Sequence, residues 1–159
     1  MQAGADSVRA MEATTLRRTA QAIAWARVGL GGAALVAPLV VTRPWVGGAA
    51  DNPSARLLAR TLGGRDLALG VGTLRALSRS DEEARPWVAL AGVSDGVDAL
   101  ATVAAFAWLP RGTRWVILGA CVGASLVSIR AATGLDTGAH SGAHNRPDAG
   151  AVTEGAGDG

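Results

Sequence analysis

The sequence predicts an all-α integral membrane protein, a bundle of four transmembrane helices followed by a disordered C-terminal tail. Hydrophobic residues make up 49% of the 159 residues and charged residues only 18%, below the roughly one quarter that is usual in soluble domains. Residues 28–42 and 115–129 carry no charge at all. The tryptophans lie near the ends of the predicted spans, where amphipathic rings settle at a membrane–water boundary; they are Trp25, Trp45, Trp87, Trp108 and Trp115.

A soluble four-helix bundle is the alternative, because no predicted span reaches eighteen uncharged residues. A helix of a soluble bundle needs a charged or polar stripe that faces water. The first and fourth predicted spans have no such stripe across their centres. The positions of the tryptophans are an independent indication of a bilayer, so the sequence favours the membrane bundle.

The first predicted span covers about residues 21–42. It follows a polar N-terminal lead, residues 1–18, which fits either a helix lying on the membrane surface or a disordered segment. At about 1.5 Å per residue the span covers roughly 30 Å, the thickness of a hydrocarbon core. Pro38 predicts a kink in this helix, which membrane helices tolerate better than soluble ones.

The second and third predicted spans have recognisable helix starts. Asn52 is a candidate N-cap and is followed by proline at the first helical position, ahead of a span at about 57–76. This span is the least apolar, since two arginines and an aspartate interrupt it. Ser80 begins a capping box, and the third span, at about 87–109, ends at Pro110.

The fourth predicted span covers about 114–133, with Gly134 as its C-terminal stop. The four-helix domain is therefore residues 19–134. The tail, residues 135–159, has hardly any apolar side chain and is predicted to be disordered. His140 and His144 lie in this tail, but the glycines around them disfavour a helix and no third ligand has suitable spacing. We expect no metal site.

The arginines indicate the orientation of the chain in the membrane. All fifteen basic residues are arginine, a bias expected of a GC-rich bacterial genome, so we expect the cytoplasmic (inner) membrane. More arginines flank one side of the predicted spans than the other, and the richer side faces the cytoplasm. That side carries Arg9, Arg17, Arg18, Arg75, Arg79, Arg85, Arg130 and Arg146, and the other carries Arg43, Arg56, Arg60, Arg111 and Arg114. Both termini are therefore predicted to be cytoplasmic.

Five charged residues inside the predicted spans form the candidate site: Arg27, Arg65, Asp66, Asp95 and Asp98. A charge at mid-bilayer costs at least about 2.5 kcal/mol, so such groups normally face the bundle interior and pair. Counting about 1.5 Å per residue from the span ends, Arg65 comes level with Asp98. Arg27 comes close to Asp95, from which it can also bridge toward Asp66.

Two arginines against three carboxylates leave one negative charge, or one protonated carboxylate. Two interpretations of this charge cluster stay open. The pairs fix helix register and membrane insertion, or they form a site that binds or relays a proton, a cation or a polar head group.

Small residues predict close helix packing. Gly92 and Gly96, and likewise Gly119 and Gly123, are spaced as small-xxx-small pairs, which let helix backbones approach closely. Packing within one chain and packing between two copies explain these pairs equally well.

Other functions lack a sequence signal. The arginines are scattered and do not gather with aromatic residues, which argues against a nucleic-acid partner. The glycines match no nucleotide-binding pattern, no nucleophile–base–acid set is apparent, and Cys121 fits a small buried apolar residue. We therefore expect no cofactor and no catalytic residues.

The stretch RTLGGRDLALG from Arg60 to Gly70, with Asp95 and Asp98 in the next helix, resembles a family of small, uncharacterised four-span bacterial membrane proteins, a domain of unknown function. The G-x-R-D-type core of that family's second helix is similar to residues 63–70 here. The resemblance covers about residues 20–133 and excludes both tails. It implies the architecture and assigns no activity.

The sequence therefore predicts a non-enzymatic inner-membrane protein, a scaffold or an assembly partner with a buried Arg/Asp cluster. Its surroundings would be the lipid bilayer, and its partners a second copy or another membrane protein. The alternative is a small transporter or a proton- or cation-coupled carrier. A lipid-modifying membrane enzyme comes third, because it needs a reactive group that the sequence does not show.

Overall fold

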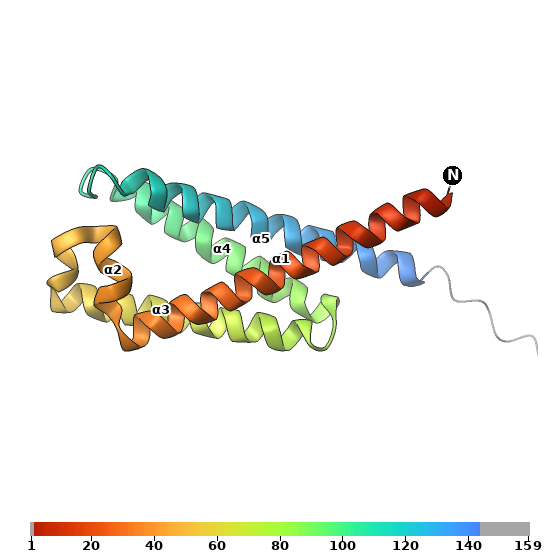
Figure 1. The fold of residues 1–159 in the computed structure, drawn as a ribbon, viewed down its shortest axis with the longest axis horizontal. Coiled ribbons are helices and arrows are strands. Elements are labelled where there is room, and N and C mark those ends of the chain that lie inside the picture. Colours follow the sequence, from red (N-terminus) through yellow and green to blue (C-terminus); the bar gives the residue numbers. More distant parts are fainter. Residues whose placement is uncertain (1, 144–159) are drawn as a thin grey trace, which may run out of the picture.

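The computed structural model describes residues 2–143, and within this range every regular element is a helix (Figure 1). The elements are α1 (Gln2–Val36), α2 (Pro38–Val46), the 3-10 helix η1 (Gly47–Asp51), α3 (Pro53–Leu77), α4 (Asp81–Ala104) and α5 (Arg114–Ala143). The prediction of an all-α fold is confirmed.

The four long helices form two antiparallel hairpins. Helix α1 packs along α3, and α4 packs along α5, whereas the contacts between the two hairpins are sparser. The N-terminus and the turn at residues 78–80 lie at one end of the bundle, which we call the N-terminal end (Figure 1). Helix α2, η1 and the turn at residues 105–113 lie at the other end, which we call the α2 end.

The starts of α3 and α4 form where the sequence predicts them. The Asn52 side chain accepts a hydrogen bond from the backbone N–H of Ser54 at 2.9 Å, and Pro53 occupies the first turn of α3. The Ser80 side chain accepts a bond from the N–H of Glu83 at 3.1 Å. In both cases the cap satisfies a backbone donor that the first helical turn leaves without a partner.

The first predicted span, residues 21–42, is wrong as a single helix. Helix α1 ends at Val36, and the chain then bends by 102° into α2 and η1. Pro38 has no N–H to donate to the carbonyl of Ala34 and so continue the α1 hydrogen bonds. Beside this break, Arg60 Nε donates to the carbonyl oxygen of Leu35 at 3.2 Å. The predicted kink is therefore present, but it turns the chain back across the end of the bundle.

The structure also moves the predicted boundaries of the N-terminal lead and the C-terminal tail. Residues 2–18 of the lead are helical, one of the two forms that the sequence allows, and they are continuous with the first span in α1. Residues 5–28 contain neither glycine nor proline, and such a run favours a helix. Helix α5 runs past Gly134 to residue 143. Gly134 lies against Leu16 of α1 and so serves close packing instead of a helix stop. Residues 144–159 of the predicted tail lie outside the described residues.

Two helices are long and apolar enough to cross a membrane: α4, and the Arg114–Leu135 part of α5. The bent pair of α1 with α2 and η1 is a third if it counts as one span. Helix α3 does not qualify on composition, because it contains Arg56, Arg60, Arg65, Asp66 and Arg75. Two or three of the four predicted spans are thus long and apolar enough to cross a membrane.

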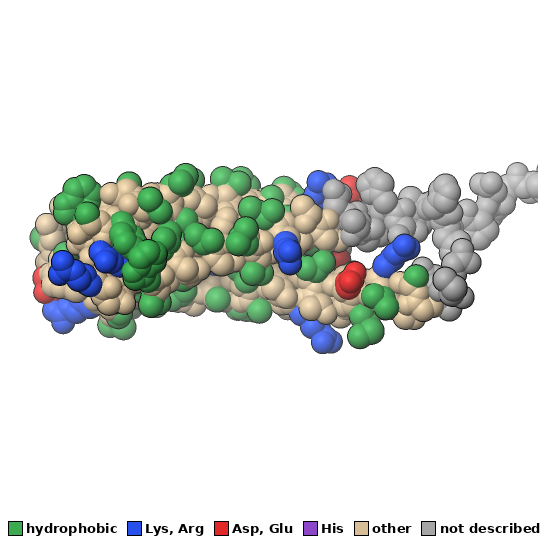
Figure 2. Space-filling view, turned by 90° about the horizontal axis from the view of Figure 1, so that it is seen from above, with side chains coloured by type: hydrophobic (Ala, Val, Ile, Leu, Met, Phe, Trp, Pro, Cys, Tyr) green, Lys and Arg blue, Asp and Glu red, His purple; other side chains and the backbone are tan. Residues whose placement is uncertain are grey.

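Many large apolar side chains face outward, and two charged side chains are buried. Large apolar side chains are exposed along the outer faces of the helices, for example Leu100 of α4 at 71% and Val116 of α5 at 67%. Arg27 and Asp95 are buried. In Figure 2 the visible charged side chains lie toward the two ends of the molecule, with apolar surface between them. An apolar exterior around buried charges suits lipid and not water.

Glycines set the closest packing within the first hairpin. Gly31 of α1 and Gly63 of α3 lie backbone to backbone, so that a Cβ added at Gly31 would come within 2.5 Å of the Gly63 carbonyl oxygen. A Cβ added at Gly70 would lie 2.7 Å from the carbonyl oxygen of Ala24. These positions exclude side chains because two helix backbones approach closely there.

The close packing of α1 on α3, which we call the α1–α3 seam, predicts that substitutions at two neighbouring glycines differ in their effect on stability. At Gly63 a Cβ would lie 2.7 Å from the Cβ of Ala34, whereas at Gly64 it would meet nothing within 4 Å. Gly63→Ala should lower the free energy of unfolding by about 1–3 kcal/mol through overpacking. Gly64→Ala should leave it unchanged or raise it by up to about 1 kcal/mol through helix propensity. Thermal unfolding in one detergent compares the two variants, and equal effects would contradict the seam.

Candidate functional site

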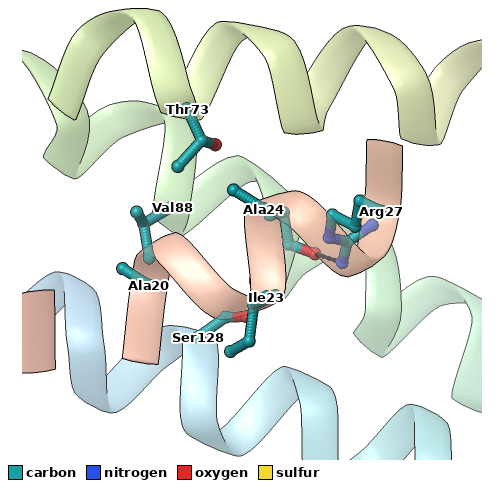
Figure 3. A pocket seen from close by; sticks show the side chains of 8 residues that line it. Ala20, Ile23, Ala24, Arg27, Thr73, Val88 and Ser128 are labelled. Atoms are coloured by element: carbon teal, nitrogen blue, oxygen red, sulfur yellow. Dashed lines mark hydrogen bonds between the residues drawn. The ribbon is translucent and has the colours of Figure 1, made fainter. Parts of the chain in front are cut away.

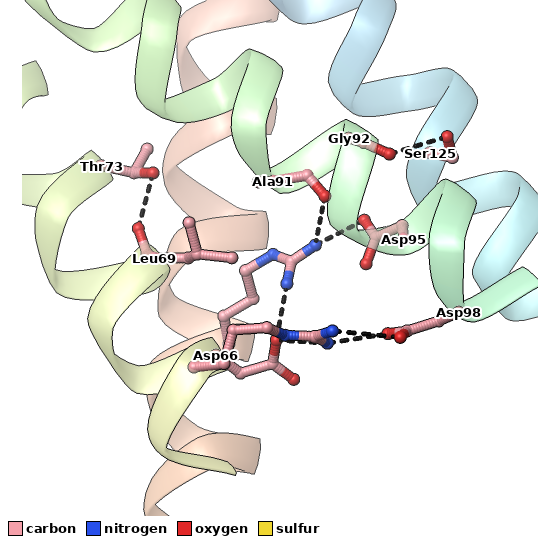
Figure 4. A network of polar contacts seen from close by, with 10 residues as sticks. Asp66, Leu69, Thr73, Ala91, Gly92, Asp95, Asp98 and Ser125 are labelled. Carbon is pink, nitrogen blue, oxygen red and sulfur yellow. Dashed lines mark hydrogen bonds and ion pairs between the residues drawn. The ribbon is translucent and has the colours of Figure 1, made fainter. Parts of the chain in front are cut away.

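The structure brings the five predicted charged residues together in one network of ion pairs, whose three carboxylates are labelled in Figure 4. Arg27 comes from α1, Arg65 and Asp66 from α3, and Asp95 and Asp98 from α4. We call these five residues the Arg–Asp cluster. It joins three of the four long helices and both hairpins.

Arg27 is the most deeply buried member of the cluster, with 8% of its side chain exposed. Its Nη1 donates to Asp66 Oδ1 at 2.9 Å. Its Nη2 lies 2.5 Å from Asp95 Oδ2 and also donates to the carbonyl oxygen of Ala91 at 3.2 Å. One guanidinium thus connects α1 to α3 and to α4.

Arg65 makes the second set of contacts. Its Nη1 and Nη2 donate to the two carboxylate oxygens of Asp98 at 3.0 and 2.7 Å, a bidentate pair. Nη2 also donates to Asp66 Oδ1 at 3.2 Å. Bidentate arginine–carboxylate pairs are among the stronger and more directional hydrogen bonds in proteins.

The signs of charge alternate along the cluster in the order Asp95, Arg27, Asp66, Arg65, Asp98. The pairs between helices are those that the depth of each residue predicts. The contact between the sequence neighbours Arg65 and Asp66 was not predicted, because adjacent residues of a helix point about 100° apart. The long arginine side chain bridges that angle.

A cavity of about 600 Å³ opens between the two hairpins on the side of the cluster toward the α2 end. Four members of the cluster line it, namely Arg65, Asp66, Asp95 and Asp98. Most of the other lining residues are apolar and come from all five α-helices, among them Leu30, Val41, Leu62, Ala101 and Ile117. The cavity is thus an apolar space with a charged floor.

Alanines leave the room for this cavity. Ala101 of α4 and Ala105, the residue that caps the end of α4, line it together with Ala120 and Ala124 of α5. Each pair is four residues apart, so each lies on one helix face. Sequence reasoning missed the cavity, although these pairs are visible in the sequence. The spacing of the alanines does not predict that these two helix faces lie opposite each other across a gap.

A second, much smaller cavity of about 10 Å³ lies on the other side of Arg27 (Figure 3). Ala20, Thr73, Val88 and Ser128 are among its lining residues. This volume is close to the space that one water molecule needs. Arg27 lines the small cavity, and the rest of the cluster lines the large one, so the cluster lies between the two.

The predicted packing glycines divide into two groups. Gly92 and Gly96 of α4 face α5: the side chain of Ser125 donates to the carbonyl oxygen of Gly92 at 2.9 Å, and a Cβ at Gly96 would lie 3.4 Å from Ser125 Oγ. Gly119 and Gly123 have nothing within 4 Å of an added Cβ among the described residues. Their face of α5 is turned away from the bundle, so packing within the chain does not explain them.

Within residues 2–143, no group of three His, Cys, Asp or Glu side chains is arranged to hold a metal ion. The carboxylates of the cluster are instead held by guanidinium groups. His144 lies outside the described residues, and the side chain of His140 is likewise not described.

No protein-family model matches the chain, and neither does any curated protein or any solved structure. The resemblance of residues 20–133 to small four-span bacterial membrane proteins therefore stays a prediction.

The bidentate pair predicts an energetic coupling between Arg65 and Asp98. Arg65→Leu and Asp98→Leu should each lower the free energy of unfolding, by up to about 3–5 kcal/mol for a buried pair. The double variant should recover part of the loss, because two apolar groups suit this depth. Thermal unfolding of the four proteins in detergent gives a coupling energy, expected to be about 1–3 kcal/mol.

Arg79 and Glu83 provide the matched control for this cycle. They form an exposed ion pair at 3.2 Å, four residues apart, and such pairs contribute about 0.3–0.5 kcal/mol. If the cycle at Arg65 and Asp98 gave a coupling no larger than this control, the pair would not stabilise the bundle.

Proposed function

We propose that this chain is a four-pass protein of the bacterial inner membrane that binds a small hydrophobic molecule within the membrane, as a binding or carrier protein and not as an enzyme. One observation carries the proposal, the cavity of about 600 Å³ with apolar walls and a charged floor. Small-molecule sites typically measure about 300–1,000 Å³ and have mostly apolar linings with a few polar groups. A protein that serves only as a scaffold needs no such cavity, so this feature favours the carrier over the scaffold.

The positions of the charges in α3 support its role as the fourth span. Arg65 and Asp66 point into the bundle and are paired there. The remaining arginines of α3 lie in its first two turns and its last turn, while Leu62 and Val71 between them are 47% and 49% exposed. The surface that α3 offers to lipid is therefore apolar, although its overall composition is not.

The tryptophans support a bilayer around the bundle. Trp25 and Trp87 lie at a similar level, because Gly70 packs on the backbone of Ala24 and Gly72 packs on the Trp87 ring. The other three tryptophans lie at the α2 end, in α2, in the 105–113 turn and at the start of α5. From Trp87 to the end of α4 at Ala104 is about 26 Å at about 1.5 Å per residue, close to the thickness of a hydrocarbon core.

The chemistry of the cavity supports binding over catalysis. Each carboxylate at its floor forms an ion pair with an arginine. The described lining contains no histidine that could serve as a base beside Cys121 or beside a threonine. Such a pair is what nucleophilic catalysis needs.

Reporter fusions test the topology. Fusions after Arg79 and after Thr137 should report the cytoplasm, and a fusion after Ala50 should report the opposite side, because α2 and η1 lie at the opposite end of the bundle from the 78–80 turn. Recovery of the protein in the soluble fraction without detergent would contradict the membrane assignment.

Cys121 tests the cavity, because it is the only cysteine in the chain and lines the cavity wall. N-ethylmaleimide should alkylate it in intact membranes. Ala101→Leu, which fills the cavity from the facing helix α4, should slow alkylation about tenfold. Ala104→Leu is the matched control, since Ala104 is exposed on the same helix and is not part of the lining. Equal rates in the two variants would show that the reagent does not reach Cys121 through the cavity.

A further inference from the structure

We propose that the molecule bound in the cavity is an amphiphile with one positively charged head group, an amine or a quaternary ammonium, whose head lies between Asp95 and Asp98. This inference rests on the proposed function, and it adds the chemical class of the ligand.

The charge of the cluster is the first argument. The cluster contains two guanidinium groups and three carboxylates, and its order begins and ends with a carboxylate. One carboxylate is therefore left without a guanidinium of its own within the cluster, and its charge is neutralised either by a proton or by a bound cation. In a low-dielectric interior such a charge strongly favours a bound cation.

The positions of the two terminal carboxylates are the second argument. Asp95 and Asp98 are three residues apart on α4, which places them on one helix face with a rise of about 4.5 Å between them. Both line the cavity. A single positive charge between them would have a carboxylate on each side, so that opposite signs would alternate around a closed ring.

The accessible atoms of the cluster are the third argument. The Asp98 side chain is 32% exposed and the Asp95 side chain 11% exposed, and both line the cavity, so a ligand reaches Asp98 most readily. The guanidinium Nη atoms of Arg65 are already engaged with the carboxylates of Asp98 and Asp66. The Nε atoms of Arg27 and Arg65 have no hydrogen-bond partner among the described residues, but both are buried away from the cavity surface. The floor thus offers acceptors and few free donors, which selects against an anionic head group.

The walls explain why the ligand is an amphiphile and not a bare ion. A proton or a metal ion would need only the cluster, whereas the cavity extends from the cluster to Trp45 and Val46 of α2 through apolar side chains. An apolar tail that follows the head group would fill this space and displace poorly bound water.

A matched series of ligands tests the proposal. The protein is reconstituted into zwitterionic vesicles, and decyltrimethylammonium, decanol and decyl sulfate are added below the concentrations that disrupt the vesicles. The readout is protection of Cys121 from N-ethylmaleimide, compared at equal membrane-bound concentrations. The ammonium compound should give half-protection at a concentration at least tenfold lower than decanol, and decyl sulfate should be the weakest of the three.

Two carboxylate variants separate the head-group site from general surface charge. Asp98→Asn removes the excess negative charge of the cluster, so the tenfold preference for the ammonium compound should disappear while protection by decanol stays. Asp51→Asn should retain the preference, because Asp51 forms an exposed pair with Arg43 at the α2 end and does not line the cavity.

The outcomes distinguish this inference from the proposed function. Equal protection by all three compounds, or a preference that persists in Asp98→Asn, would overturn the cationic head group and leave the binding cavity in place. No protection by any compound, together with Cys121 alkylation that Ala101→Leu does not slow, would overturn both. If the Asp98 variant does not accumulate, the comparison of the three compounds on the unaltered protein still tests the preference for a cationic head group.

Discussion

The guanidinium of Arg27 is the contact on which the arrangement of the bundle depends. It lies in α1, bonds to α3 through Asp66, and crosses to the second hairpin through Asp95 and the carbonyl oxygen of Ala91. Lipid tails are as apolar as leucine, so there is little hydrophobic driving force between helices within a bilayer. Polar contacts between the hairpins would therefore contribute a large share of the stability of the bundle, although they are few. Arg65 and Asp98 form the second such crossing.

The two hairpins differ from the space between them in how closely they pack. Within the first hairpin, Gly31 and Gly63 bring two backbones together, and within the second Gly92 faces the backbone of α5. Between the hairpins, on the side toward the α2 end, opposed alanines leave the cavity open. Close packing thus joins the two helices of each hairpin, and the ion pairs of the Arg–Asp cluster join the hairpins to each other while a space remains beside them. This combination lets a small bundle keep a cavity without losing its shape.

Local features of the sequence were sufficient to predict the helix starts and the members of the cluster. Asn52 and Ser80 cap helices through contacts with residues two and three positions away, and a buried charge needs a partner at its own depth whatever the fold. Features that depend on tertiary contacts were not predictable in this way. Pro38 predicts a kink, but the size of the bend, 102°, also depends on how α2 packs across the end of the bundle. Gly134 has the sequence signature of a helix stop, yet it is used to pack against Leu16.

If the chain crosses the membrane four times, as we propose, the position of the charges along it also constrains how the protein is made. Helix α3 carries Arg65 and Asp66, and each such group at mid-bilayer adds about 2.5–3.5 kcal/mol to the free energy of insertion of an isolated helix. Its partner Asp98 lies in α4, which leaves the ribosome later. The translocon would therefore have to hold α3 beside α1 until α4 arrives, so that the two helices enter the lipid together. The order of synthesis, and not only the final contacts, would then decide whether the chain reaches its native topology.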